Sequence, residues 1–271
     1  MKNVAGSGVR WVDVAPGRFP GWIASFAVRH GVPAAGPAAG AAPGGGKTIP
    51  AGELLVAVPG RLQVTFTAPD GAVAECHPPF AESFRWPPPG PDSGGAGSGG
   101  AGSGDGAGPA GFPAGRAAEL AGAVAAHAAV PRTVGVLLVR LGGYSAGVFA
   151  GYPPALADAK TGSRLVHGRS AAGGWSQHRF ARRREKQADE ALRAAADAAV
   201  AVFGRGPRLD AVVLGGDKRA AAELRGDPRL APYLALATER FITVPDPKRS
   251  VLETTPAQFT AVRIRLTDPP D

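Results

Sequence analysis

Cysteine is nearly absent from this 271-residue chain, which contains Cys76 alone. A single thiol can form no disulfide within the chain and no cysteine cluster around zinc. The five histidines contain neither an HxxxH nor an HExxH pair, which are the spacings that place two imidazoles on one metal ion. We therefore expect no metal site.

Long apolar segments are also lacking. No apolar run approaches the ~18 residues that a membrane-spanning helix needs. The N-terminal sequence MKNVAGSGVRWVDVAPG contains no apolar stretch of the kind found in secretory signals. These absences predict a soluble, cytoplasmic protein with no membrane partner.

Acidic residues are in the minority. The chain has 30 lysines and arginines against 22 acids, a formal charge of +8 and a pI near 10.2. Such an excess favours an anionic partner, with nucleic acid the first candidate. Only six of the basic residues are lysines, so a general compositional bias toward arginine is an alternative explanation. The placement of the charge has to decide between the two.

Residues 87–115 lack the composition of regular structure, because 12 of these 29 residues are glycine and 6 are proline. Such a stretch cannot bury enough apolar surface to offset its ordering entropy. Its glycines do not stand between a strand and a helix, so a phosphate-binding loop is not indicated. The composition divides the chain into an α+β unit (1–86), a disordered insertion (87–115), a connecting helix (116–130) and a catalytic domain (131–271).

Apolar periodicity predicts the elements of the two larger parts. In the first part we expect a helix at 19–31, two short strands within 54–66 and a strand at 72–76. In the second we expect a hairpin of 134–141 and 144–151, helices at 176–203 and 217–225, and strands at 163–168, 209–216, 240–244 and 259–266. This order predicts an α+β fold in which helices cover a mixed sheet.

Positive charge is concentrated in residues 164–186, which contain seven cations and one acid, a net charge of +6. Several of these cations fall in the first turns of the helix expected at 176–203, where the macrodipole disfavours them. Helix stability alone does not explain that placement, whereas phosphate binding does. A solvated basic face is the alternative. The expected RNA-binding residues are Arg169, Trp175, Arg179, Arg182, Arg183, Arg184 and Lys186; Trp175 is equally compatible with stacking on a base or with anchoring the loop.

The sequence GGWSQ precedes this basic run. Gly173 and Gly174 allow backbone conformations with positive φ and a close approach to a partner. Ser176 is a candidate N-cap for the helix that follows. Gln177 does not titrate near neutral pH, so in a catalytic loop it would act by positioning a water or donating to an oxyanion. An ordinary glycine loop ending in a helix cap is the alternative.

Taken together, these residues resemble the central domain of eukaryotic and archaeal class-1 peptide release factors, whose Gly-Gly-Gln loop enters the peptidyl-transferase centre. The resemblance is closer still to the actinobacterial Vms-like release factors, peptidyl-tRNA hydrolases in which two residues separate the glycine from the glutamine. It covers about 131–271, and a weaker W-x3-F-x3-H-G pattern (Trp22, Phe26, His30, Gly31) extends it to the N-terminal part.

This resemblance implies a release-factor-like mixed sheet and a catalytic loop formed by Gly173, Gly174, Ser176 and Gln177. It implies peptidyl-tRNA hydrolysis without a cofactor, by a monomer whose partners are peptidyl-tRNA and the RNA of the large ribosomal subunit. Two related functions stay open: a non-catalytic RNA- or ribosome-binding protein, and a nuclease that cuts near the tRNA 3′ end.

A serine hydrolase is a further alternative, because Gly143-Tyr144-Ser145-Ala146-Gly147 matches the G-x-S-x-G nucleophile elbow. The elbow requires a strand, a sharp turn and then a helix. The residues that follow Ser145, AGVFAGYPP, instead indicate a strand, which argues against this function.

Overall fold

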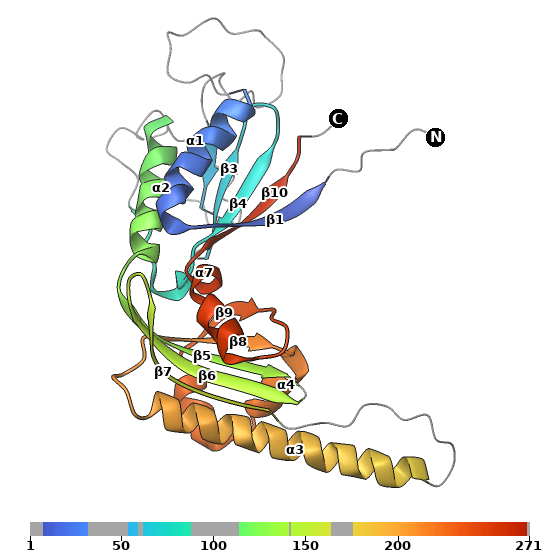
Figure 1. Ribbon diagram of the computed structural model, residues 1–271. Coiled ribbons are helices and arrows are strands. Elements are labelled where there is room, and N and C mark those ends of the chain that lie inside the picture. The colour runs from blue at the N-terminus through green and yellow to red at the C-terminus, as the bar shows by residue number, and fades with distance from the viewer. Residues whose placement is uncertain are drawn as a thin grey trace, which may run out of the picture. The chain divides into compact units, whose positions relative to one another are not determined.

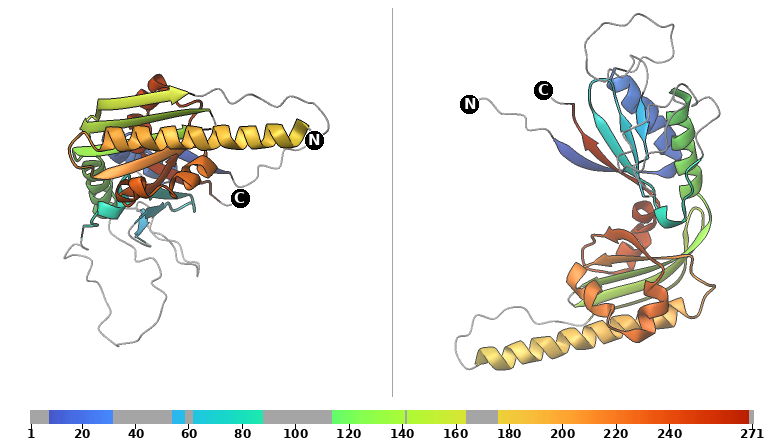
Figure 2. Two further views of the ribbon diagram at one scale, coloured as in Figure 1. Left: turned by 90° about the horizontal axis from the view of Figure 1, so that it is seen from below. Right: turned by 180° about the vertical axis from the view of Figure 1, so that it is seen from behind.

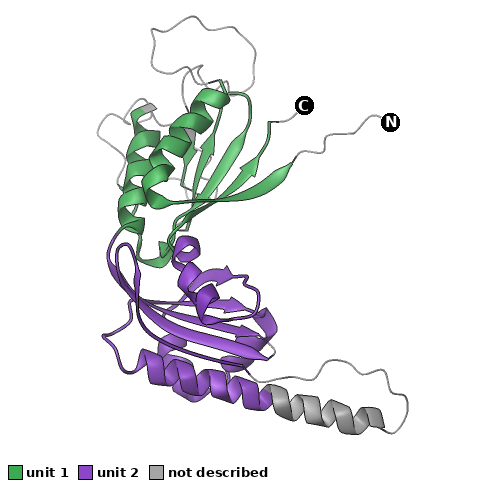
Figure 3. Ribbon diagram, in the orientation of Figure 1, with its two compact units in different colours: residues 1–129, 260–271 green, residues 130–259 purple. Residues whose placement is uncertain are grey.

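The computed structural model describes residues 8–31, 54–58, 62–87, 114–140, 142–163 and 176–269, and the side chains of 55, 114 and 176–188 stay outside the description. The chain divides into two compact units, residues 1–129 with 260–271 and residues 130–259 (Figure 3). Both units combine a sheet with helices, so the predicted α+β class is confirmed.

The first unit contains a five-stranded antiparallel sheet in the order β1-β10-β4-β3-β2 (Figure 1). Its strands are β1 (Val9–Val14), β2 (Leu55–Ala57), β3 (Val64–Thr67), β4 (Val73–His77) and β10 (Val262–Thr267). Two helices, α1 (Phe19–Arg29) and α2 (Ala114–Ala128), cover one face, and short 3₁₀ turns lie at Pro16–Arg18 and Ala81–Ser83.

Alternation of side chains explains why only one face of this sheet meets the helices. Phe66, Cys76 and Ile264 are fully buried, whereas their chain neighbours are at least partly exposed. The buried set packs against Phe19 and Phe26 of α1 and against α2. The segment expected to be a connecting helix is therefore α2, a structural part of this core.

The position of the C-terminal strand corrects the extent of the domain expected at 131–271. β10 lies between β1 and β4, pairing Ile264 with Val12 on one side and with Cys76 on the other. Residues 260–271 therefore belong to the first unit. Local periodicity identified this segment as a strand but carried no information on its partners, which lie near the opposite end of the chain.

The second unit contains a five-stranded mixed sheet in the order β7-β6-β5-β8-β9. Its strands are β5 (Arg132–Arg140), β6 (Gly143–Gly151), β7 (Ala155–Ser163), β8 (Ala211–Gly216) and β9 (Ala237–Ile242). β5, β8 and β9 run parallel to one another, whereas β6 and β7 are antiparallel to their neighbours. The mixed sheet expected from the sequence is thus present.

Helices cover both faces of this second sheet (Figure 2). They are α3 (Ser176–Phe203), α4 (Lys218–Leu224), α5 (Ala231–Leu234), α6 (Arg249–Thr254) and α7 (Pro256–Phe259), with a 3₁₀ turn at Pro228–Leu230. α3 and α4 bury their apolar residues against Val139, Val148 and Leu214. On the opposite face Phe259 of α7 contacts Phe149 of β6.

The hairpin and the long helix agree with the sequence prediction, since β5 and β6 pair over their full lengths and α3 spans 176–203. Strand β7 was not predicted. It reads ALADAKTGS, and its residues are partly or fully exposed because it lies at the sheet edge. The strand expected at 163–168 overlaps β7 only at Ser163, and residues 164–168 lie outside the described residues.

Candidate functional site

The residues predicted to form the catalytic loop lie around the start of α3. This helix begins at Ser176, so the predicted start is confirmed, and Gln177 falls in its first turn. Arg179, Arg182, Arg183, Arg184 and Lys186 occupy the turns that follow. Arg169, Gly173, Gly174 and Trp175 lie outside the described residues. The roles assigned to all of these side chains stay predictions.

The position of Gln177 in the first turn of α3 leaves its backbone N–H without an acceptor inside the helix. The first four backbone N–H groups of an α-helix have no acceptor within the helix. Since α3 begins at Ser176, the N–H of Gln177 is one of those four. Both its backbone donor and its uncharged side-chain amide therefore suit hydrogen bonding to an oxygen of a bound substrate.

The C-terminal half of α3 anchors the helix to the second unit. Ala195, Ala198 and Ala199 are completely buried, and Val202 is buried with them against the sheet. Alanine has little side-chain entropy to lose and allows the helix axis to approach the strands closely. Because α3 has 28 residues, its length is about 42 Å at 1.5 Å per residue.

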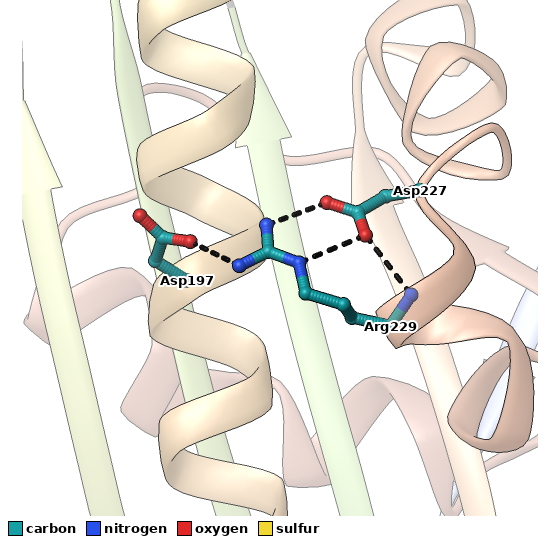
Figure 4. A network of polar contacts seen from close by, with 3 residues as sticks. All are labelled: Asp197, Asp227 and Arg229. Atoms are coloured by element: carbon teal, nitrogen blue, oxygen red, sulfur yellow. Dashed lines mark hydrogen bonds and ion pairs between the residues drawn. The ribbon is translucent and has the colours of Figure 1, made fainter.

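A polar contact on the surface joins α3 to the segment before α5 (Figure 4). Arg229 donates from Nη1 to Asp197 of α3 at 2.7 Å and from Nη2 to Asp227 at 2.7 Å. The backbone N–H of Arg229 also donates to the Asp227 carboxylate, at 3.0 Å. These hydrogen bonds, those from the guanidinium first, lower the pKa of Asp227. The contact binds the C-terminal half of α3 to the rest of the second unit, far along the helix from Gln177.

Strands β5, β7 and β8 of the second sheet all end at the same edge, which is formed by their carboxyl ends. β7 ends at Ser163, which pairs with Gly143 beside the hairpin turn, and β5 ends at Arg140. β8 ends at the same edge, where the N–H of Asp217 donates to the carbonyl of Val139 at 2.8 Å. β7 therefore ends at the same edge as the carboxyl ends of β5 and β8.

The segment 243–248, which follows β9, is bound to this edge by two side chains. Arg140 donates from Nη1 to the carbonyl oxygen of Val244 at 3.0 Å, and Ser145 donates from Oγ to the carbonyl oxygen of Pro247 at 2.7 Å. Asp217 caps α4 beside it by accepting from the N–H groups of Arg219 and Ala220. These bonds give the edge a defined backbone framework.

Three exposed cations lie on this edge. Arg140 bonds only to a carbonyl, Lys218 lies 5.9 Å from the centre of the Phe241 ring, and Lys248 follows Pro247. Within the described part of the chain, none of the three forms an ion pair with a carboxylate. Sequence reasoning missed them because they are isolated in the sequence and only the strand order brings them to one edge.

The serine hydrolase alternative is excluded by the position of Ser145. Gly143–Gly147 lies inside β6, where the chain makes no sharp turn into a helix. The Ser145 side chain is completely buried, and its hydroxyl donates to the carbonyl oxygen of Pro247. A nucleophile must instead be exposed to the substrate and paired with a base.

Two further findings concern only the described part of the chain. It contains no group of three or more His, Cys, Asp or Glu side chains with the geometry of a metal site. Among the same residues, no helix is both long enough and apolar enough to cross a membrane.

Gln177 in the first turn of a basic helix, in a unit with a mixed sheet, agrees with the resemblance to peptide release factors. Residues 132–265 match the family model described as "Actinobacteria/chloroflexi VLRF1 release factor". That match comprises 134 of the 271 residues, and this part of the chain is similar to the VLRF1 release factor family. The resemblance expected from the sequence is thereby confirmed.

Among solved structures, the chain is similar to an archaeal translation termination factor, aRF1, with 14% identity over 47% of this chain and a TM-score of 0.31. A structure titled "Archaeal protein" has 15% identity over 72% of this chain and a TM-score of 0.26. The chain spans 36% and 52% of the lengths of these two proteins. No curated protein matches the chain. The similarity to the family rests on the family model.

Proposed function

We propose that the protein is a peptidyl-tRNA hydrolase that works on the ribosome in the cytoplasm and rescues stalled large-subunit complexes. It releases the nascent peptide from P-site tRNA through the loop Gly174-Trp175-Ser176-Gln177. The observation that carries this proposal is the position of Gln177 in the first turn of α3, directly before a run of arginines, in a segment matched by a release factor family.

The proposed reaction is hydrolysis of the ester between the peptide and the terminal ribose of the tRNA. Water attacks the carbonyl carbon, the bond to the ribose oxygen breaks, and that oxygen leaves with a proton as a free hydroxyl. Gln177 orients the attacking water through its side-chain amide, because an amide cannot act as a general base near neutral pH. Its backbone N–H donates to the oxyanion or to the departing ribose oxygen. No cofactor takes part.

The basic turns of α3 and the sheet edge serve this reaction by binding RNA. Arginines at 179, 182 and 183 lie on one side of the helix by their spacing. Arg140, Lys218 and Lys248 add exposed positive charge at the edge formed by the carboxyl ends of β5 and β8. Phosphates of ribosomal RNA and of the tRNA acceptor end are the proposed partners of both groups, and the protein binds them as a monomer.

The test is a release assay on purified stalled large-subunit complexes. Gln177→Ala is expected to lower the release rate by about 100-fold or more, the effect of losing one transition-state donor. Binding to the complex is expected to change little. Gln187→Ala is the matched control, because the same residue type is changed in the same helix almost three turns later. Full release by Gln177→Ala would show that the assignment is wrong.

The tRNA product distinguishes the two possible cuts. Ester hydrolysis leaves an intact CCA end with a free 3′ hydroxyl, whereas a shortened tRNA would show nuclease action. Charge reversal at Arg182 and Arg183 is expected to weaken binding and to reduce the slope of log K against log salt by about one for each phosphate that is no longer bound. Arg193→Glu, an exposed position further along α3, is the control. An unchanged slope in the double variant would remove the basic turns from the interface.

A further inference from the structure

Along the strands of the first sheet, every second side chain points away from the helices. These side chains form the outer face of the sheet. Its outward residues form three cross-strand rows that follow from the strand register. The rows are Val9–Thr267–Val73–Thr67, Trp11–Arg265–Glu75–Thr65 and Asp13–Arg263–His77. In the described part of the chain, α1 and α2 pack only on the opposite face (Figure 1). This outer face therefore carries an aromatic ring, two arginines, the carboxylates of Asp13 and Glu75, and small hydroxyl side chains.

Trp11 is the most unusual residue of this face, since 50% of its surface is exposed on a strand at the sheet edge. Its ring is held from one side, with the guanidinium carbon of Arg263 4.6 Å from the ring centre. The His77 ring centre lies 5.6 Å from that of Trp11 at an interplanar angle of 43°. Val9, 49% exposed, adjoins Trp11 on the same side of β1. These contacts fix the orientation of the tryptophan while half of its surface stays accessible.

The two arginines of β10 supply the cationic donors of the face. Arg263 is exposed, lies opposite Asp13 in the strand register, and places its guanidinium group over the Trp11 ring. Arg265 donates from Nη1 to both oxygens of Glu75 at 3.0 Å, and its side chain is 40% exposed. Its second terminal nitrogen is therefore available for another acceptor. Cationic donors next to an oriented aromatic ring match the two parts of a nucleotide, the base and the phosphate.

We propose that this outer face binds single-stranded RNA, with one base stacked on Trp11 and the adjoining phosphates bound by Arg263 and Arg265. An apolar peptide or a second copy of the chain fits the face less well, because Arg263 lies over the Trp11 ring and Arg265 lies opposite Trp11 in the register. A duplex fits poorly too, since its bases are stacked within the helix and their faces are closed to a protein ring.

This inference gives the first unit a role of its own. It does not depend on hydrolysis at Gln177, because the proposed loop and the outer face belong to different units. A protein that holds an unpaired stretch of RNA through one unit and acts through the other is expected to bind its complex by two separable interactions. Removing either interaction then lowers affinity without changing the other.

The experiment measures binding of the full-length protein to a fluorescent oligouridine of about 10 nucleotides by anisotropy, at low salt. Trp11→Ala is expected to weaken binding by about 5- to 150-fold, the range found for removing one stacking residue. Trp11→Phe keeps an aromatic ring and is expected to retain most of the affinity. Val28→Ala, which alters another exposed apolar residue on α1, is the control and is expected to bind like the unmodified protein.

Photo-crosslinking keeps the test decisive if an alanine variant folds poorly. Oligouridine carrying 4-thiouridine is expected to crosslink to residues of β1 or β10 in the unmodified protein. Crosslinks confined to other parts of the chain, or equal affinities of Trp11→Ala and Val28→Ala, would overturn the proposal. Dimerisation that disappears with Trp11→Ala would overturn it as well, because the occupant would then be a second copy. Gln177→Ala is expected to bind the oligonucleotide normally, so failure of the hydrolysis hypothesis leaves this result unchanged.

Discussion

Replacing Ser145 with alanine tests whether the hydroxyl of this residue has a structural or a catalytic role. The Ser145 hydroxyl is completely buried in β6 and donates to the carbonyl oxygen of Pro247 at 2.7 Å. That bond holds the segment after β9 against the hairpin of β5 and β6. Alanine retains the Cβ and removes only the oxygen, so packing changes little and the effect is almost entirely that of the missing hydrogen bond.

The expected decrease in stability follows from the burial of both partners. A net hydrogen bond contributes about 0.5–1.5 kcal/mol, and a buried acceptor left without a donor costs about 1–3 kcal/mol. Pro247 is itself buried, so water cannot readily replace the hydroxyl. We expect Ser145→Ala to lower the free energy of unfolding of the second unit by about 1–2 kcal/mol.

Hydrogen–deuterium exchange of the β6 peptide under increasing denaturant measures this change in the second unit alone. Thr254→Ala is the matched control in the same unit. Its hydroxyl also donates to a backbone carbonyl, that of Val251 at 2.8 Å, but on the exposed surface of α6. That variant is expected to change stability by less than about 0.5 kcal/mol.

The rate of peptide release by Ser145→Ala tests whether Ser145 acts as a nucleophile. We expect the folded variant to release peptide at nearly the unmodified rate, because Ser145 is buried and bonded to backbone. If release were abolished while exchange of β6 stayed unchanged, Ser145 would be the nucleophile, and the assignment of Gln177 would be wrong.

Two further predictions concern the folds of the units. Gly216→Ala is expected to destabilise the second unit by about 2–4 kcal/mol, because Gly216 has φ of +99° and an added Cβ would collide with the Val139 carbonyl; Gly206→Ala, at a site with open space, is the control, and equal urea midpoints would refute the reasoning. Cys76 is fully buried, and this burial, with the charge of Glu75, raises the pKa of its thiol. Ellman's reagent is therefore expected to leave the native protein unmodified and to titrate one thiol after denaturation, whereas rapid reaction of the native protein would show that the first core opens readily.

Local patterns were sufficient for the elements around the candidate site. The hairpin is indicated by two apolar runs around a glycine turn, and both the turn and the runs are features of neighbouring residues. The predicted helix start at 176 rested on a serine that follows a glycine pair, which is again a local signal. Burial of Ala195 and Ala199 agrees with the periodicity of the same helix.

Pairing between distant segments could not be predicted in this way. β10 pairs Val262 with Val14, although these residues lie near opposite ends of the chain. β7 went unnoticed because an edge strand exposed along its length needs little apolar alternation. The grouping of Arg140 with Lys218 and Lys248 depends on the order of β5, β8 and β9, which no single segment encodes.

The composition of α3 changes along its length, from polar and basic in its first turns to alanine-rich in its later turns. Its first turns carry the arginines and Gln177, whereas its later turns carry the buried alanines and Asp197, which Arg229 binds. Catalysis by positioning requires that the donor be held by a rigid element, because the glutamine contributes no proton transfer of its own. A helix packed closely through alanines on a five-stranded sheet provides such an element. The proposed mechanism therefore accounts for the order along α3, because the donor comes first, the charge that binds RNA follows it, and the alanines that anchor the helix come last.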